Sequence, residues 1–311
     1  MVIDAVVAFF VLGVASQLLG AKIPFPDSLY KTLSMFLMIA IGLKGGLALQ
    51  EHIDPDLITM SITVVAFGLI LPLIAYPLLR YFGQLDKVNS GAIAAHYGSV
   101  SVATYAVAVA LLEANHISYE AYFPLFVVLL EMPAILVGLI LAKGSLKLIN
   151  IHFIKKELVA NPSILLMLGS LVIGYLGELS VQKLSPYFIE LFSGVLALFL
   201  LKMGLVAGQQ LSALKENSLF LLSFAVLMPM VGGIAGTALG YLLGFSAGGI
   251  ALMAVLGASA SYIAVPAAMK ESLPEANSGM SITAALGITF PFNVLLNVPF
   301  FIAVGQHVSR Y

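Results

Sequence analysis

The sequence predicts an all-α integral membrane protein with ten transmembrane helices in two inverted repeats of five helices each. Three observations support this prediction. Hydrophobic residues make up 61% of the 311 residues and charged residues only 9%, whereas soluble domains carry about a quarter charged residues. Apolar runs long enough to cross a bilayer recur from one end of the chain to the other. Similar motifs also recur in the two halves at a nearly constant separation.

The apolar runs are divided by clusters of charged residues, proline and glycine. The ten predicted segments are 2–19, 28–49, 57–82, 88–112, 119–142, 163–181, 187–208, 218–243, 248–270 and 279–306. Each is predicted to be helical, because backbone groups in lipid must form their hydrogen bonds within the segment. The first segment has no basic region ahead of it, so we interpret it as a span rather than a signal peptide.

Two features of the composition exclude other classes of protein. The chain has no cysteine, which excludes disulfides and thiol chemistry. Its net charge of −1 provides no basic surface for nucleic acid.

The basic residues of the loops predict the orientation, because cytoplasmic loops carry an excess of Lys and Arg. With the N-terminus outside, the inner side receives Lys22, Lys31, Arg80, Lys87, Lys143, Lys147, Lys155, Lys156, Lys215 and Lys270. The outer side receives only Lys183 and Arg310. We therefore expect a multi-pass protein of a bacterial plasma membrane, with both termini outside and the linker 143–162 in the cytoplasm.

Four pairs of matching motifs indicate an internal repeat. FPLFVVLLEMP at 123–133 matches FPFNVLLNVP at 290–299, and IGLKGGLALQ at 41–50 matches MGLVAGQQLS at 203–212. Two shorter matches, GAIA with GGIA and EAN with EAN, fall in the same order. The predicted repeats are 1–142 and 163–311. Because each holds an odd number of spans, the second enters the membrane from the opposite side, as in many secondary transporters.

Small hydroxyl residues lie in the middle of the fourth and ninth segments, in HYGSVSVATY at 96–105 and GASASYIAVP at 257–266. Glycine and serine weaken a helix, so we expect both segments to break into half-helices whose N-termini present N–H groups to an anion. A site lined by hydroxyls suits a small hydrophilic anion, whereas a large organic substrate favours aromatic walls. The alternative is that these small residues only allow close helix packing.

Oxygen-bearing side chains line one face of the tenth segment. Thr289, Asn293 and Asn297 are spaced four residues apart and share a helix face. Nearby prolines free backbone carbonyls, and an oxygen-rich face suits a hard cation such as sodium. The repeat partner of Asn297 is Glu131, an acid within an apolar span, which indicates a functional role. The alternative for these residues is hydrogen bonding between the fifth and tenth spans.

Three further ionisable residues fall within predicted spans. Lys44 and Lys202 flank the repeated glycine motif, and we expect their long side chains to extend to the cytoplasmic surface. His96 has no counterpart in the second half, where Val255 or Leu256 occupies the equivalent position. We therefore interpret His96 as a packing residue rather than a proton relay or an anion ligand.

The stretches AAHYGSVSVATY, GASASYIAVPAAMKESLPEAN and GITFPFNVLLNVP closely resemble the sodium-dependent bicarbonate transporter family known from cyanobacteria as SbtA. The resemblance covers nearly the whole chain. It implies a core domain of spans three to five and eight to ten, a gate domain of spans one, two, six and seven, a homotrimer and elevator-like transport. Its substrate-site residues would be Gly98, Ser99, Ser101, Ala258, Ser259 and Ser261. Its sodium-site candidates would be Thr104, Glu131, Tyr262, Thr289 and Asn293.

The resemblance implies secondary active symport of bicarbonate with co-transported sodium, and not an enzyme. Three alternatives stay open: a sodium-coupled symporter of another small or organic anion, an intramembrane enzyme using His96 and Ser99, and a passive anion channel. Against the enzyme, the serines are paired between the halves whereas the histidine is not. The linker of about 20 residues is shorter than the cytoplasmic insertion of cyanobacterial members. This difference argues against regulation by the family's PII-like partner protein.

Overall fold

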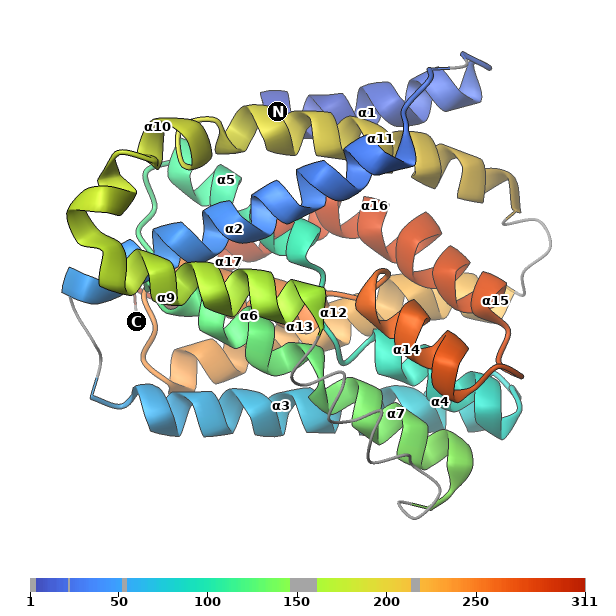
Figure 1. Cartoon of the computed structure of the whole chain (residues 1–311). Helices are drawn as coiled ribbons and strands as arrows, with labels where there is room; N and C mark the ends of the chain where they lie inside the picture. The colour runs from blue at the N-terminus through green and yellow to red at the C-terminus, as the bar shows by residue number, and fades with distance from the viewer. Residues whose placement is uncertain (1–3, 22, 52–54, 146–160, 214–218, 311) are drawn as a thin grey trace.

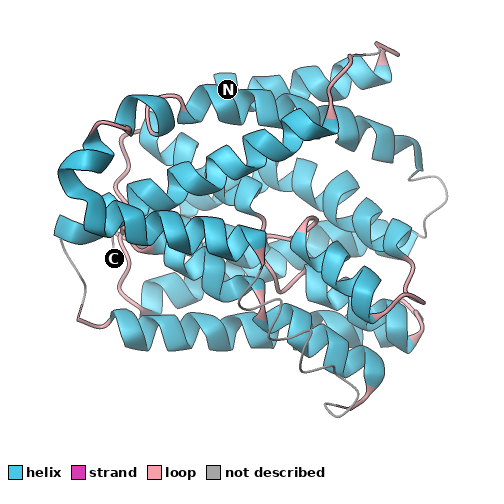
Figure 2. Ribbon diagram, viewed as in Figure 1, coloured by secondary structure: helices cyan, strands magenta, loops and turns pink. Residues whose placement is uncertain are grey.

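The structure is a computed structural model that describes residues 4–21, 23–51, 55–145, 161–213 and 219–310. The described residues form helices joined by short loops and contain no strand (Figure 2). The predicted linker 143–162 lies mostly outside the described residues, as do several of the basic residues used to predict the orientation. The all-helical class predicted from the sequence is therefore confirmed.

The first half contains seven α-helices and a π-helical turn among its described residues. They are α1 (Ala5–Leu18), α2 (Asp27–Glu51), α3 (Leu57–Pro77) continued by η1 (Leu78–Phe82), α4 (Lys87–His96), α5 (Val102–Ala114), α6 (Phe123–Glu131) and α7 (Pro133–Lys143).

The second half begins with α9 (Pro162–Gln182), α10 (Ser185–Phe188), α11 (Phe192–Ala213), α12 (Leu219–Leu242), α13 (Ala247–Ala258) and α14 (Ala264–Ser272). It ends in one long run of helical turns: α15 (Ser278–Ile282), η4 (Thr283–Thr289), α16 (Phe290–Phe292), η5 (Asn293–Asn297) and α17 (Val298–Val308).

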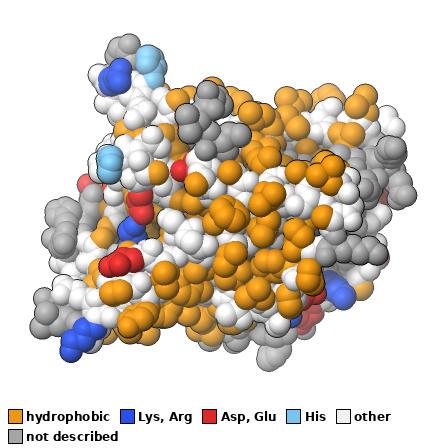
Figure 3. All heavy atoms as spheres, turned by 90° about the horizontal axis from the view of Figure 1, so that it is seen from above, with side chains coloured by type: hydrophobic (Ala, Val, Ile, Leu, Met, Phe, Trp, Pro, Cys, Tyr) orange, Lys and Arg blue, Asp and Glu red, His pale blue; other side chains and the backbone are white. Residues whose placement is uncertain are grey.

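Six helices of the described residues are long and apolar enough to cross a membrane. The other four predicted spans correspond to shorter apolar helices, at Ala5–Leu18, Val102–Ala114, Pro162–Gly177 and Ala247–Ala258. Two of these are short because the fourth and ninth segments are interrupted in their middle. Most helices run along a common direction (Figure 1). Apolar side chains cover most of the face in Figure 3, while the charged side chains gather toward its two ends.

Two pairs of helices approach each other through glycine. At Gly204 of α11, an added Cβ would lie 2.1 Å from the Phe10 carbonyl oxygen of α1. At Gly46 of α2, an added Cβ would lie 2.1 Å from the Leu171 carbonyl oxygen of α9. Because no side chain fits at such distances, the backbones of α1 and α11, and of α2 and α9, pack directly against each other.

Candidate substrate and sodium site

The fourth and ninth segments are both broken where the hydroxyl clusters predict it. Helix α4 ends at His96 and α5 begins at Val102, while α13 ends at Ala258 and α14 begins at Ala264. The connecting residues 97–101 and 259–263 adopt no regular helix. Glycine and serine at these positions lower the helical preference.

The two breaks contact each other through a pair of buried hydrogen bonds. The Ser261 N–H donates to the His96 carbonyl oxygen at 2.9 Å, and the His96 Nδ1 atom lies 2.6 Å from the Ser261 carbonyl oxygen. Both residues are buried. The pair satisfies backbone groups that the interrupted helices leave free, so it holds the two broken segments together in the protein interior.

A neighbouring helix supports each break. In the first half, the Ser99 hydroxyl donates to the Glu131 carbonyl oxygen at 3.2 Å. In the second half, the Asn293 amide donates to the Ala258 carbonyl oxygen at 2.8 Å, and the Asn297 amide donates to Asn293 Oδ1 at 2.8 Å. These bonds fix the breaks to the segments predicted as the fifth and tenth spans.

Glycine is required beside each break by a close approach of a second helix. An added Cβ at Gly98 would lie 2.4 Å from Pro72 Cδ of α3. An added Cβ at Gly257 would lie 2.2 Å from the Gly232 carbonyl oxygen of α12. The glycines of the hydroxyl clusters therefore serve packing, as the alternative interpretation of these motifs proposes.

Two helix N-termini point into the crossing region from the two breaks. Ser101 caps α5, because its hydroxyl accepts the Thr104 N–H at 3.2 Å and the Thr104 hydroxyl at 2.9 Å. Helix α14 begins after Ile263 without a side-chain cap. An N-terminus carries a partial positive charge and free N–H groups, so the two together favour an anion at the crossing.

A small cavity of about 10 Å³ lies beside these N-termini. Its polar lining comes from Ser101, Glu131, Ser163, Ser261 and Tyr262. The Tyr262 hydroxyl is buried and interacts with the Ser101 side chain. A space of this volume holds about one water-sized particle, and hydroxyl and carboxylate oxygens are the ligands that hard cations prefer. The arrangement is suited to a single dehydrated cation next to an anion-binding helix end.

Four of the predicted residues are thus brought together: Ser101, Ser261, Glu131 and Tyr262 line one cavity. Thr104 contacts this group through Ser101. The other polar lining residue, Ser163, was not predicted from the sequence; it lies in the first turn of α9.

The remaining predicted residues surround the crossing without lining this cavity. The Ser259 hydroxyl donates to Val255 of its own helix at 2.8 Å. The Thr289 hydroxyl donates to the Ala225 carbonyl oxygen at 2.6 Å and lies 2.9 Å from the Tyr97 hydroxyl. Their assignment to a substrate or sodium site stays a prediction.

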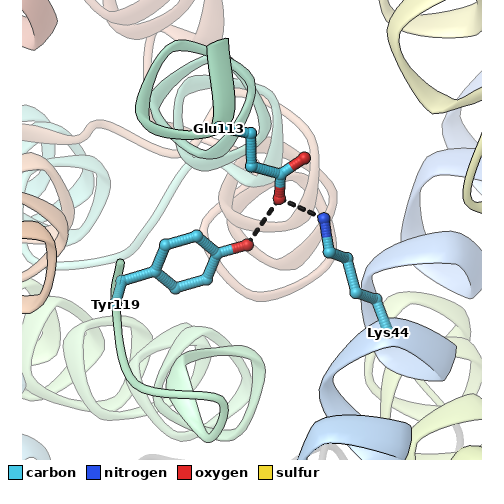
Figure 4. A network of polar contacts seen from close by, with 3 residues as sticks. All are labelled: Lys44, Glu113 and Tyr119. Atoms are coloured by element: carbon cyan, nitrogen blue, oxygen red, sulfur yellow. Dashed lines mark hydrogen bonds and ion pairs between the residues drawn. The ribbon is translucent and has the colours of Figure 1, made fainter. Parts of the chain in front are cut away.

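Both intramembrane lysines pair with an acidic side chain. Lys202 lies 3.3 Å from Asp27 Oδ1 and 3.3 Å from the Phe25 carbonyl oxygen. Lys44 pairs with Glu113 at the end of α5, and the Tyr119 hydroxyl donates to the same carboxylate oxygen at 2.7 Å. Figure 4 shows the lysine and the tyrosine converging on that carboxylate. An acidic partner therefore replaces the cytoplasmic extension expected for Lys44.

A comparison with family models decides the family. The model of the Na⁺-dependent bicarbonate transporter superfamily matches residues 5–306. The chain belongs to this superfamily. A comparison with curated proteins found no match.

Membership agrees with the features of the molecule already described. A Na⁺-dependent bicarbonate transporter is a multi-pass membrane protein, and six apolar helices of the described residues are long enough to span a bilayer. Sodium and bicarbonate are accordingly the two ions that the family points to. Among the described residues, no three Asp, Glu or His side chains gather as they do in a multidentate metal site.

Proposed function

We propose that the protein imports bicarbonate together with sodium, as a secondary active symporter of a bacterial plasma membrane. The observation that carries the proposal is the cavity at the crossing, where Ser101, Ser261, Glu131 and Tyr262 converge beside the N-termini of α5 and α14. Sodium occupies the oxygen-lined cavity, and bicarbonate binds at the adjacent helix ends. Each ion lowers the electrostatic cost of burying the other.

The coupling has an energetic basis. Moving one negative charge into a negative-inside cell costs about 2.3 kcal/mol per 100 mV. Importing one sodium with each bicarbonate makes the step electroneutral, so the sodium gradient drives accumulation. The hydroxyls that line the crossing favour a small hydrophilic anion over the alternative of an organic anion with a bulky tail.

The proposed architecture has ten spans in two inverted repeats. Two features support it. Helices α1 and α11 cross at Gly204, and α2 and α9 cross at Gly46, and these are the pairs one–seven and two–six that such a symmetry exchanges. Each break is also held by the segment predicted as the last span of its own half.

The proposed transport movement follows from this division. A core of α3–α7 and α12–α17 carries the crossing, and a gate of α1, α2, α9 and α11 surrounds it. The loaded core moves across the membrane as an elevator, within a homotrimer. A PII-like regulatory partner, given the short linker, is not part of this proposal.

The test is uptake of labelled bicarbonate into liposomes that contain the purified protein. An inward sodium gradient should drive accumulation, whereas potassium replacing sodium should abolish it. Unlabelled bicarbonate should compete, and acetate or lactate should not. Accumulation that persists without sodium would contradict the coupling, and mere equilibration would indicate a channel.

Matched serine variants test the site. Ser101→Ala and Ser261→Ala should each lower uptake at limiting bicarbonate about 10- to 100-fold, because a hydrogen bond to a charged group contributes about 1.5–3 kcal/mol. Ser170→Ala is the control, since Ser170 is equally buried but donates to Leu166 within α9. Equal losses in all three variants would indicate a structural effect instead.

A further inference from the structure

A second cavity, of about 40 Å³, lies between α4, α14 and the segment that leads into α15. His96 and Ala92 line its buried end, whereas Lys270 and Ser278 line its exposed end. It shares no lining residue with the cavity of the proposed sodium site. The His96 side chain, 1% exposed, separates this cavity from Ser261 of the crossing.

The hydrogen bond at one ring nitrogen of His96 determines what the other nitrogen offers. The Nδ1 atom lies 2.6 Å from the Ser261 carbonyl oxygen, and a carbonyl only accepts hydrogen bonds, so Nδ1 carries the proton. Burying a charge without a counter-ion is costly, which favours the neutral ring. Nε2 then presents a lone pair that can accept a hydrogen bond, and the His96 side chain lines the cavity. The buried end of the cavity is a hydrogen-bond acceptor.

The exposed end of the cavity has the opposite chemistry. Lys270 contributes an ammonium group, and Ser278 and the buried Ser281 contribute hydroxyls. A matching ligand is a small anion that also carries one O–H donor. Hydrogencarbonate has this property, because its single O–H faces one way and its two charged oxygens the other. Nitrate and formate have the same charge and are also planar, but they have no O–H to donate.

We infer that this cavity is a second, separate binding site for hydrogencarbonate, in which His96 accepts the O–H and Lys270 attracts the charged oxygens. The inference rests on the proposed function and adds a subsite to it. The cavity has room for about three to four water-sized particles at roughly 10–15 Å³ each, which suits an anion of four heavy atoms bonded to one another. Because α14 and α15 meet at the side predicted to be cytoplasmic, the site receives the anion on release from the crossing.

Occupancy of the cavity is transmitted to the crossing through the His96 ring. A donor on Nε2 makes the Nδ1–H group more acidic, and hydrogen bonds in such a chain strengthen one another. The bond to Ser261 tightens when hydrogencarbonate binds. His96 therefore distinguishes hydrogencarbonate from anions that cannot donate a hydrogen bond. Binding of hydrogencarbonate strengthens the bond from His96 to Ser261, which lies in the segment that holds the transport site.

The test is nuclear magnetic resonance of the ¹⁵N-histidine-labelled full chain in lipid, in potassium buffer without sodium. The chain has five histidines, and His96→Asn identifies the His96 signal by its absence. Hydrogencarbonate should shift the Nε2 resonance saturably, and nitrate or formate should not. Lys270→Gln should weaken the titration about three- to tenfold. Lys87→Gln, another exposed lysine at the start of α4 that does not line the cavity, should leave it unchanged.

Transport of hydrogencarbonate out of preloaded liposomes tests the same site by another route. In His96→Asn the amide can still donate to Ser261, but no acceptor reaches the Nε2 position. The hydrogencarbonate concentration required for efflux should therefore rise about tenfold. In His96→Gln an acceptor reaches the Nε2 position, so the requirement should return toward that of the wild type. Recovery in His96→Asn but not in His96→Gln would overturn the inference in favour of a purely structural role.

Two results of the titration would also overturn it. No shift with hydrogencarbonate would mean that water alone occupies the cavity, and equal shifts with nitrate would mean an unselective anion effect. If His96→Asn does not fold, the titrations of Lys270→Gln and of the wild type still decide the question. Sodium-driven uptake by the wild type is measured separately, so a failure of the proposed function is distinguished from a failure of this site.

Discussion

The Lys44–Glu113 pair joins the two bodies that are proposed to move against each other. Lys44 belongs to α2 of the proposed gate, and Glu113 belongs to α5 of the proposed core. The side chains are 39% and 34% exposed, so the pair is intermediate between a surface pair, worth up to about 1 kcal/mol, and a buried one. The Tyr119 hydroxyl donates to the same carboxylate oxygen at 2.7 Å, but it does so within the proposed core. Only the ion pair joins the two bodies, and it stabilises this arrangement by roughly 1–2 kcal/mol.

Removing the charge at Lys44 should release the core from this position. Lys44→Met keeps the length of the side chain and loses the ion pair. Since about 1.4 kcal/mol corresponds to a tenfold change in an equilibrium constant, the ratio of the present state to the displaced state should fall about 5- to 30-fold. The direction of the shift follows because the pair exists in this state, and a displaced core separates α2 from α5.

Spin labels measure this ratio directly. The chain has no native cysteine, so Leu176→Cys in α9 and Ile62→Cys in α3 introduce two clean labelling sites, 73% and 67% exposed. Pulsed electron paramagnetic resonance in lipid nanodiscs then gives the populations of the two gate–core distances. Lys202→Met is the matched control, because Lys202 pairs with Asp27 inside the gate. An unchanged distribution in Lys44→Met, or an equal shift in Lys202→Met, would refute the reasoning.

Three further predictions test separate parts of the molecule. Gly232→Ala places a Cβ 2.0 Å from the Gly257 carbonyl oxygen and should lower the free energy of unfolding by roughly 1–3 kcal/mol. Gly169→Ala meets nothing within 4 Å and should raise it by up to about 1 kcal/mol, so equal changes in melting temperature would contradict the packing argument. Glu131→Gln should raise the sodium concentration for half-maximal uptake at least about tenfold, with the yield of folded protein unchanged; an unaltered sodium dependence would exclude Glu131 from the site. At Asp86 burial raises the pKa, but hydrogen bonds from the first turn of α4 outweigh it and hold the pKa below 3.8. This cap, worth about 1 kcal/mol, stabilises the fold above about pH 4 and is lost as the pH falls through the lower folded-state value. The melting temperatures of wild type and Asp86→Ala should therefore converge in acid, and a gap independent of pH would contradict the assignment.

Hydropathy, together with the glycine and proline residues between the apolar runs, was enough to predict where the helices lie. The segment 57–82, for example, corresponds to α3 continued by η1, because a lipid-facing helix must be apolar along its full length. The two breaks were predictable for a related reason. Glycine and serine in the middle of an apolar segment cost helix stability, so their presence at 98–101 and 257–261 indicated irregular backbone within the membrane.

The orientation of individual hydroxyls was not predictable in the same way. Helix α13 continues to Ala258, so Ser259 follows its last turn and donates back to Val255, as serine commonly does within a helix. Ser261, two residues later, lies beyond the helix, where its backbone N–H and carbonyl oxygen pair with His96 of the other half and the residue lines the cavity. The local sequence shows only which residue types such a cluster contains, not where their hydroxyls point. Which hydroxyl turns back and which faces a cavity depends on the residue at which the helix ends and on a partner 165 residues away.

The two halves support their breaks with hydrogen bonds of opposite direction, and this difference has a chemical consequence. In the first half the broken segment donates, from Ser99 to the backbone of Glu131. In the second half the supporting helix donates, from the side chain of Asn293 to the backbone of Ala258. The second half therefore uses a side chain for support where the first half uses only a backbone carbonyl. Glu131 lines the cavity with Ser101, whereas the Asn293 amide donates to Ala258 and the Asn297 amide donates to Asn293. A repeat with exact chemical symmetry would place either two acids or two amides at the crossing. One acid beside two positive helix ends suits the binding of one cation and one anion together, which is what coupled transport of sodium and bicarbonate requires.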